Sequence, residues 1–257
     1  NFNSKLLIMS ATQPCFMETK ELVNNPDAIF EQQKRYQIVL RLETVSIDSF
    51  IEECIFRIHD EDWHQKKVLI VLNTRKSARF VVDSLESHIQ ISTYFLSADV
   101  TPKERLENID KIKGNQPCLV IATQCIEAGV DIDMDIVIRD FAPLDSLIQC
   151  AGRCNRNGIK KRADVEVVNL SDSKNKKYSE LVYDQSLLEY TGVILSQAPE
   201  KIPEENVFQL ISEYFRRIKE NMNVGKRSAD NWAFWREELN VSKLLRGDNE
   251  KIDFIVE

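Results

Sequence analysis

The stretch Cys118-Leu-Val-Ile-Ala-Thr-Gln-Cys-Ile-Glu-Ala-Gly129 decides the fold class. It opens with five apolar residues, which predict a strand, and continues into a short polar turn that ends in a glycine. Five other short apolar runs resemble its first half: Ile38–Leu42, Val68–Leu72, Thr93–Leu96, Ile136–Ile138 and Val165–Asn169. Segments of helical period lie between them, with apolar stripes at Phe50, Cys54, Ile55 and Ile58 and at Ala78, Val81, Val82 and Leu85. The alternation predicts an α/β protein with a parallel sheet flanked by helices.

Four regions follow from these patterns. Residues 36–170 are expected to form the α/β domain, in which Thr101-Pro-Lys-Glu104 starts a further helix by capping it. Residues 13–35, with Pro14 and an Asn-Asn-Pro turn, are expected to be a connector. Residues 171–257 are expected to form a mainly helical extension, with an apolar stripe at Val207, Leu210, Ile211, Tyr214, Phe215 and Ile218 and with aromatic residues at Trp232, Phe234 and Trp235. Residues 1–12 would hold a lone strand whose partners are elsewhere, so we expect a fragment of a longer polypeptide.

Composition narrows the class of function. The 257 residues carry a net charge of −7, which argues against a broad basic surface and leaves only a local groove for nucleic acid. Six scattered cysteines without a C-x-x-C pair, and only three histidines, predict reduced thiols and no metal site formed by this chain. No signal peptide or membrane-spanning segment is recognisable, so a cytoplasmic protein is expected.

The residues with the clearest chemistry form the segment Gln149-Cys-Ala-Gly-Arg153-Cys-Asn-Arg156. We expect it to be helical after Pro143. Arg153 and Arg156 are three positions apart and would share one face of a helix, so that their guanidinium groups could converge on a polyphosphate. The alternative is a surface helix with two solvated arginines.

This segment resembles motif VI of superfamily 2 helicases, and the match covers Gln149, Gly152, Arg153 and Arg156. The resemblance implies a RecA-like fold in which the two arginines act as fingers on the γ-phosphate of ATP held by a facing domain. Gln149 would belong to the same catalytic set, and Gly152 would lie beside the nucleotide.

Residues 119–133 resemble motif V of the same helicases. The resemblance implies that Thr123 and Gln124 face a nucleic-acid backbone, whereas Gly129 and Asp131 face the nucleotide. One loop would then contact both ligands. Taken alone, the same residues suit a plain strand-to-helix turn whose glycine is a cap.

Three weaker resemblances complete the set. Asn73 and Thr74, at a strand end that opens a helix, correspond to a phosphate contact with a single strand, and Ser97 follows the next strand in the same way. Any helix N-terminus uses such residues. Ser10 and Thr12 resemble motif III, which couples ATP state to strand binding.

The sequences of the segments Ala142-Pro-Leu-Asp-Ser146 and Gln149 to Gly158 most resemble those of the CRISPR-associated helicase of type I systems. That resemblance implies an ATP-dependent translocase on single-stranded DNA, joined to an HD nuclease domain and recruited by a guide-RNA surveillance complex in CRISPR interference. The sequence lacks a G-x-x-x-x-G-K-[ST] phosphate loop. ATP would therefore be shared with an absent first RecA-like domain, Mg²⁺ would be held by that half, and the isolated chain would be inactive.

Two alternatives stay open. The chain could be part of another superfamily 2 helicase that acts on DNA or RNA. It could also be a non-catalytic binding module whose helical tail docks a partner protein.

Overall fold

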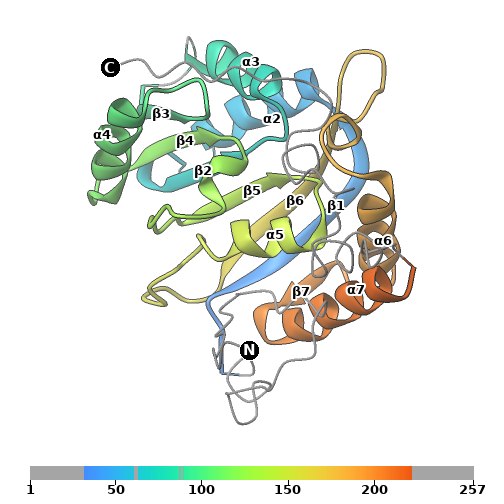
Figure 1. The fold of residues 1–257 in the computed structure, drawn as a ribbon. Helices are drawn as coiled ribbons and strands as arrows, with labels where there is room; N and C mark the ends of the chain where they lie inside the picture. The colour runs from blue at the N-terminus through green and yellow to red at the C-terminus, as the bar shows by residue number, and fades with distance from the viewer. Residues whose placement is uncertain (1–31, 61–62, 87, 89, 222–257) are drawn as a thin grey trace, which may run out of the picture. The chain divides into compact units, whose positions relative to one another are not determined.

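A seven-stranded sheet forms the centre of the fold (Figure 1). The computed structural model describes residues 32–60, 63–86, 88 and 90–221. Its strands are β1 (Tyr36–Ser46), β2 (Lys67–Val71), β3 (Ser92–Leu96), β4 (Cys118–Ala122), β5 (Ile136–Asp140), β6 (Ala163–Ser171) and β7 (Lys201–Pro203). Their order across the sheet is β3-β4-β2-β5-β6-β1-β7. Every neighbouring pair is parallel except β1 and β7, which are antiparallel. The predicted α/β class and all six predicted strands are confirmed.

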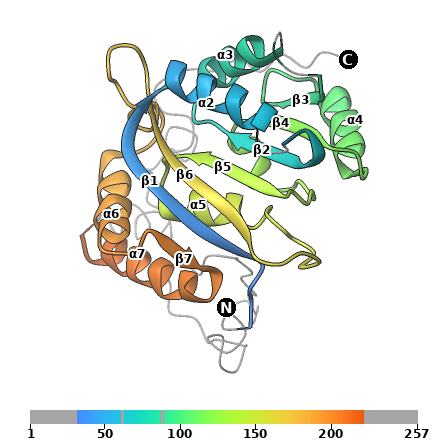
Figure 2. The same ribbon diagram turned by 180° about the vertical axis from the view of Figure 1, so that it is seen from behind.

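Helices cover both faces of the sheet, which explains why the central strands are continuously apolar. On one face, α2 (Ile47–Asp60) and α3 (Arg75–Glu86) pack with the 3-10 turn η1 (Trp63–Gln65). Figure 2 shows α2 in front of the sheet on that side. The opposite face is covered by α4 (Pro102–Lys113), α5 (Leu144–Ala151), α6 (Gln185–Ser196) and α7 (Val207–Asn221). Two parallel strands that follow each other in the chain need a crossover connection. Each connecting helix therefore runs from the carboxyl end of one strand back to the amino end of the next.

The helix signals are confirmed where they are local. The Oγ1 of Thr101 accepts a hydrogen bond from the backbone N–H of Glu104 at 3.3 Å, and Pro102 occupies the first turn of α4. The predicted stripe of α7 buries Val207, Ile211 and Tyr214. Both helices therefore form where capping and period predict them.

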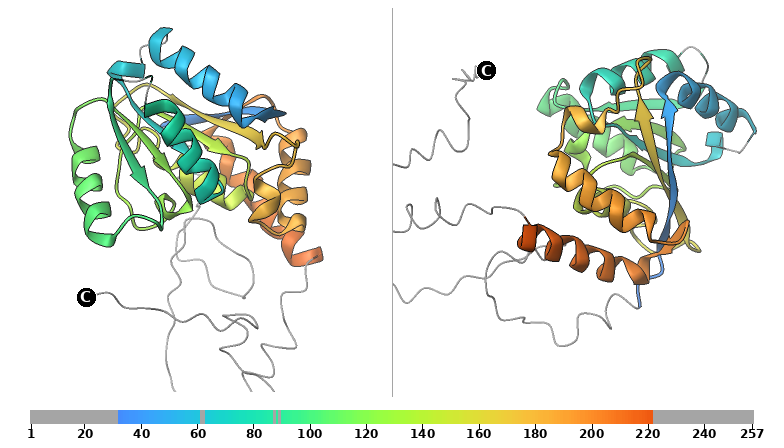
Figure 3. Two further views of the ribbon diagram at one scale, coloured as in Figure 1. Left: turned by 90° about the horizontal axis from the view of Figure 1, so that it is seen from above. Right: turned by 90° about the vertical axis from the view of Figure 1, so that its right-hand side faces the viewer.

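The end of the described chain differs from the expected helical extension in one respect. After β6, the 3-10 turn η3 (Ser179–Leu181) and α6 lead to β7, a short strand that was not predicted. In β7, Ile202 pairs with Ile38 and is buried, and η4 (Glu204–Asn206) then leads into α7 (Figure 3). Three residues are too short to show a strand period, so only the exposed edge of β1 selects this conformation. Residues up to 218 thus belong to the same compact unit as the sheet.

Several predictions lie outside the described residues. They are the first strand with Ser10 and Thr12, most of the connector at 13–35, and the aromatic residues Trp232, Phe234 and Trp235. In the ranges that the structure does describe, no helix has both the length and the apolar character that a bilayer crossing requires.

Candidate nucleotide and nucleic-acid sites

The five residues predicted to contact nucleic acid all lie where the parallel strands end, called the carboxyl edge of the sheet from here on. The side on which these strands begin is called the amino edge. Register pairs Val71 of β2 and Leu96 of β3 with Ala122 of β4, so the residues after these strands come together at one edge. The positions concerned are Asn73, Thr74, Ser97, Thr123 and Gln124. Residues from three separate motifs therefore lie close together in the fold.

Thr74 and Gln124 are the two of these residues that are partly exposed. The Oγ1 of Thr74 accepts a hydrogen bond from the N–H of Ser77 at 2.9 Å and so caps α3. The Nε2 of Gln124 donates to the carbonyl oxygen of Asn73 at 2.6 Å, which ties the two strand ends to each other.

Ser97 and Thr123 are buried, and their hydroxyl groups are used locally. The Oγ of Ser97 accepts from the N–H of Asp99 at 3.0 Å. Asn73 is also buried, and its side chain points inward, contrary to the expected phosphate contact: its Nδ2 donates to Asp140 Oδ2 and to the carbonyl oxygen of Phe141, each at 2.7 Å. The physical reason is that Arg139 on β5 donates to Asn73 Oδ1 at 2.7 Å, which holds the side chain in the interior.

Residues 123–135, called the strap from here on, run from the carboxyl edge to the amino edge of the sheet. The N–H of Thr123 donates to the carbonyl oxygen of Leu96 at one end, and Asp135 Oδ2 accepts from the N–H of Lys67, the first residue of β2, at the other. The five residues of β2 make this distance about 17 Å. Ile126, Val130 and Ile132 bury their side chains in the core beneath. The strap therefore reaches both edges of the sheet.

Gly129 gives the strap its bend. Its φ is +73°, a conformation that L residues rarely adopt, and it is exposed on the strap's outer side. A Cβ at this position would meet nothing within 4 Å, so the backbone conformation explains the glycine and crowding does not.

The predicted helix after Pro143 forms and includes Gln149, but it does not reach the arginines, so the prediction that Arg153 and Arg156 share one helix face was wrong. α5 ends at Ala151, and Gly152 closes it by donating its N–H to the carbonyl oxygen of Ile148. Arg153 follows in a turn, and Asn155 has a φ of +44°. The N–H of Asn155 bonds the carbonyl oxygen of Met134, while its side chain bonds residues 35, 160 and 161. The left-handed conformation of Asn155 and its bonds to Met134 and residue 35 replace helical continuation.

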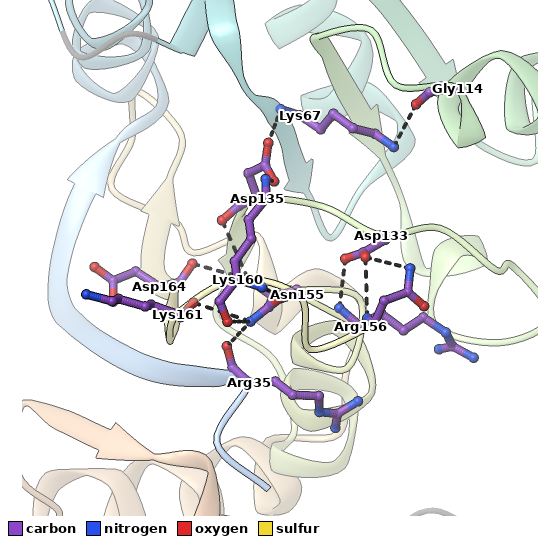
Figure 4. A network of polar contacts seen from close by, with 12 residues as sticks. Arg35, Lys67, Gly114, Asp133, Asp135, Asn155, Arg156, Lys160, Lys161 and Asp164 are labelled. Carbon is purple, nitrogen blue, oxygen red and sulfur yellow. Dashed lines mark hydrogen bonds and ion pairs between the residues drawn. The ribbon is translucent and has the colours of Figure 1, made fainter.

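The two arginines nevertheless meet the same strap (Figure 4 draws Arg156). Arg153 is 7% exposed and donates from Nε to the carbonyl oxygen of Ile126 at 3.1 Å and from Nη2 to that of Glu127 at 2.6 Å. Burial lowers the pKa of Arg153, and the positive charge of Arg156 adds to this effect. The Nε of Arg156 lies 2.8 Å from Asp131 Oδ1, and 39% of its side chain is exposed. Arg153 is thus turned inward on the strap, and Arg156 lies near the surface at its far end.

A cavity of about 420 Å³ opens beside Arg156. Four cationic side chains line it, together with amide and glycine residues: Lys34, Arg35, Arg156, Lys160, Gln32, Gln33, Asn157 and Gly158. Three of the cations have acidic partners, since Arg35 pairs with Glu204, Lys160 with Asp135 and Arg156 with Asp131. The described residues that line the cavity are cationic, amide or glycine residues, and no carboxylate is among them, which suits an anion at the amino edge.

The remaining predicted residues, Gln149 and Gly152, are both half-buried at the end of α5. Gly152 has a φ of −62°, and a Cβ would make only ordinary contacts with the carbonyl oxygens of Gln149 and Ile148. The conformation of Gly152 therefore does not require a glycine, in contrast to that of Gly129.

A buried polar network beneath the strap was missed. Arg139, in β5, is fully buried and donates to Asn73 Oδ1 at 2.7 Å, Glu127 Oε1 at 2.9 Å, Ser146 Oγ at 3.0 Å and the hydroxyl of Tyr183 at 2.8 Å. Burial raises the pKa of Glu127, against the attraction of Arg139. Burial also raises the pKa of Asp140 to about 7. The signal was present in the sequence, because Arg139-Asp140 directly continues an apolar strand.

Comparisons with known proteins identify the family and the fold. Residues 64–159 match the family model described as CRISPR-associated nuclease/helicase Cas3, C-terminal. The CRISPR-associated nuclease/helicase Cas3 of Haloferax volcanii is 34% identical over 136 residues, which cover 45% of this chain and 14% of that protein. The Cas3 protein of Streptococcus thermophilus is 32% identical over 196 residues, 68% of this chain and 19% of the relative. The chain thus spans less than a quarter of these relatives.

Solved structures share the fold. The crystal structure of T. fusca Cas3-ADP has a TM-score of 0.61 at 20% identity and covers 79% of this chain and 27% of that one. A chain of a CRISPR RNA-guided surveillance complex, pre-nicking, has a TM-score of 0.56 at 23% identity, with 79% and 28% covered. The sheet of mostly parallel strands flanked by helices is therefore RecA-like. Together with the family match, this shows that the chain carries the C-terminal helicase region of the CRISPR-associated Cas3 helicases.

Proposed function

We propose that this chain is the second RecA-like half of an ATP-driven translocase on single-stranded DNA, and that it supplies arginine fingers and part of the strand track. One observation carries the proposal: the strap joins the two edges of the sheet, with Thr123 and Gln124 at one end and the partners of Arg153 and Arg156 along the rest. A segment that contacts both sites is what a motor needs in order to link its two ligands.

At the amino edge, Arg156 is the finger with the exposure to reach a phosphate. In the structure its guanidinium is paired with the carboxylate of Asp131, which is 75% exposed and so is held weakly. The triphosphate of ATP, carried by a facing domain, would replace that carboxylate with a charge-assisted contact. Lys34, Arg35 and Lys160 line the cavity beside Arg156, and their positive charge would favour a polyanion there. Gly129, Gln149 and Gly152 would form the surrounding surface, and Mg²⁺ would be held by the facing half.

Arg153 has a different part in this proposal. Its two hydrogen bonds to strap carbonyls hold the strap against the arginine turn. A fork-shaped guanidinium can make both bonds at once, which a lysine ammonium cannot match in geometry. We propose that Arg153 meets the phosphates from this held position, so that its contacts to ATP and to the strap are made together.

At the carboxyl edge, the backbone of the DNA strand would lie across Thr74 and Gln124 and the amino end of α3. The amides of that helix end favour a phosphate. Because Asn73, Ser97 and Thr123 are buried, we assign them to shaping this surface rather than to direct side-chain contact.

The rest of the machine is also a proposal, because the chain spans 14% and 19% of the two relatives. We propose that a first RecA-like domain, coupled through Ser10 and Thr12, and an HD nuclease domain belong to the same protein. We also propose a guide-RNA surveillance complex as its partner and expect no ATP hydrolysis by the isolated chain.

Substitution of each arginine in the full-length protein tests the proposal. Arg153→Ala and Arg156→Ala should each lower ATP hydrolysis in the presence of single-stranded DNA by about 10³-fold or more, because a finger stabilises charge on the transferring phosphoryl group. The measurement is steady-state phosphate release with single-stranded DNA and, in parallel, with RNA of the same sequence, which decides which strand the motor uses.

Arg79→Ala is the matched control. Arg79 is an arginine of α3 whose side chain is 62% exposed and paired with Asp83, and it belongs to neither edge. Its loss should leave hydrolysis unchanged. Hydrolysis at the wild-type rate in both finger variants would remove the assignment of the arginines. Equal stimulation by RNA would favour the alternative of a general superfamily 2 helicase.

A further inference from the structure

Arg139 is a fully buried arginine whose hydrogen bonds join several segments of the fold. It is 0% exposed, lies in the middle strand β5, and its guanidinium donates to side chains from four other segments. Those side chains are Asn73 after β2, Glu127 in the strap, Ser146 in α5 and Tyr183 after β6. Ser146 adds a further bond, from its hydroxyl to Glu127 Oε1 at 2.7 Å.

These bonds form a continuous path between the two edges of the sheet. At the carboxyl edge, Arg139 Nη1 donates to Asn73 Oδ1 at 2.7 Å, and the carbonyl oxygen of Asn73 accepts a hydrogen bond from Gln124 Nε2. In the middle, Arg139 Nη2 donates to Glu127 Oε1 at 2.9 Å. On the way to the amino edge, the carbonyl oxygen of Glu127 accepts Arg153 Nη2 at 2.6 Å. Glu127 is therefore held by Arg139 through its side chain and holds Arg153 through its backbone.

Stability alone does not account for this arrangement. Taking a guanidinium and a carboxylate out of water costs free energy that their attraction repays only in part, and apolar side chains of similar volume often serve a core equally well. What a charged pair adds is direction, because each hydrogen bond fixes the position of one partner. Here the partners are two segments that the proposed function assigns to different ligands.

We propose that Arg139 and Glu127 form a positioning pair that couples strand binding at the carboxyl edge to the placement of the arginine turn at the amino edge. Movement of Asn73 when a strand binds shifts Arg139, which carries Glu127 and the strap with it and so moves Arg153. Neither residue touches a ligand. The inference rests on the proposed function, since it assigns a connection between its two sites.

The test separates position from stability. In the full-length protein, Arg139→Met and Glu127→Gln are combined, which removes both charges of the pair. The neighbouring carboxyl of Asp140 keeps its hydrogen bonds from Asn73 Nδ2 and the N–H of Leu170. Two quantities are then measured: the ratio of ATP hydrolysis with and without single-stranded DNA, and the ratio of DNA dissociation constants with and without a non-hydrolysable ATP analogue. We expect each ratio to move at least fivefold toward one in a double variant whose melting shows that it is folded.

An ion pair on the opposite face provides the control. Arg57 Nη1 donates to Glu166 Oε2 at 2.9 Å, and their side chains are 13% and 11% exposed. Glu166 also accepts from Arg41 at 3.2 Å, and Arg41 keeps Glu53 when Glu166 is replaced. The double variant Arg57→Met/Glu166→Gln removes a largely buried pair that lies on no path between the two sites, and it should leave both ratios as in the wild type. If both double variants changed the ratios equally, a general effect of core disruption would replace the proposal.

Tyr183→Phe guards against a double variant that fails to fold. It removes one hydroxyl, which Arg139 contacts at 2.8 Å, and keeps the ring. We expect a smaller shift of the same ratios, about twofold. Wild-type ratios in either a folded double variant or Tyr183→Phe would overturn the inference. Failure of the proposed function looks different: the wild-type protein would then show no stimulation by DNA, or Arg156→Ala would hydrolyse ATP normally.

Discussion

Removing the guanidinium of Arg139 by itself should destabilise the fold strongly. In Arg139→Met the carboxylate of Glu127, whose side chain is 13% exposed, keeps only the hydroxyl of Ser146, and Asn73 Oδ1 loses its donor. Breaking a buried pair by removal of one partner costs about 3–5 kcal/mol. Glu127 can escape part of this cost by taking up a proton, because burial already raises its pKa. We therefore expect the lower end of the range, about 3 kcal/mol.

Urea unfolding of the 257-residue chain, followed by circular dichroism, measures this loss. In thermal unfolding, about 3 kcal/mol corresponds to a fall in melting temperature of about 6–12 °C for a unit of this size. Protonation of Glu127 should also make the loss of stability depend on pH. The variant holds Glu127 with a pKa above the unfolded value of about 4.3, so its deficit should shrink as the pH falls from 8 to 5.

Arg162→Met is the control for a half-exposed pair. Arg162 binds Glu205, and their side chains are 30% and 26% exposed, so its removal should cost less than about 1 kcal/mol. A loss below about 1 kcal/mol in Arg139→Met as well would refute the reasoning, because it would mean that Glu127 does not depend on Arg139 in the folded state.

Three further predictions follow from single features. Gly129→Ala should cost about 1–2 kcal/mol in urea unfolding because the φ of +73° is unfavourable for alanine, whereas Gly152→Ala, with a φ of −62°, should be neutral within about 0.5 kcal/mol; equal losses would contradict the conformational argument. Burial raises the pKa of Asp140 to about 7, so its contribution to stability is fully present below the unfolded value of about 3.9 and is lost as the pH rises through 7. Asp140→Asn should therefore reduce the difference in unfolding midpoint between pH 5 and pH 8, and an unchanged difference would show that Asp140 titrates normally. The isolated chain, with its net charge of −7, should bind single-stranded DNA weakly in fluorescence anisotropy, with affinity falling steeply between about 50 and 200 mM salt; salt-independent binding would exclude phosphate contacts as its source.

Strand positions and class were predictable because their signals are local. Five apolar residues in a row at Cys118–Ala122 can be buried on both faces only in a covered parallel sheet, and the cap at Thr101 acts within one turn of helix. β7 carried no such signal, since its three residues become a strand only where the edge of β1 accepts them.

The side-chain geometry of the site was less predictable. The spacing of Arg153 and Arg156 suggested one helix face, but Gly152 ends the helix and Asn155 binds Met134, twenty-one positions earlier in the chain. Asn73 suggested a ligand contact, but its partner Arg139 lies 66 positions away. Hydrogen bonds between residues so far apart in the chain produce no periodic pattern in the sequence, so they could not be predicted from it.

By itself the sequence determined the α/β class, six of the seven strands and the segments that carry chemistry, because apolar runs, caps and glycines act over a few residues. Only the tertiary structure decided that the strap links the two edges, that the arginines sit in a turn, and that Arg139 is buried beneath them. The physical reason is that a buried charge takes its place from partners on several strands, which become neighbours only when the sheet is assembled.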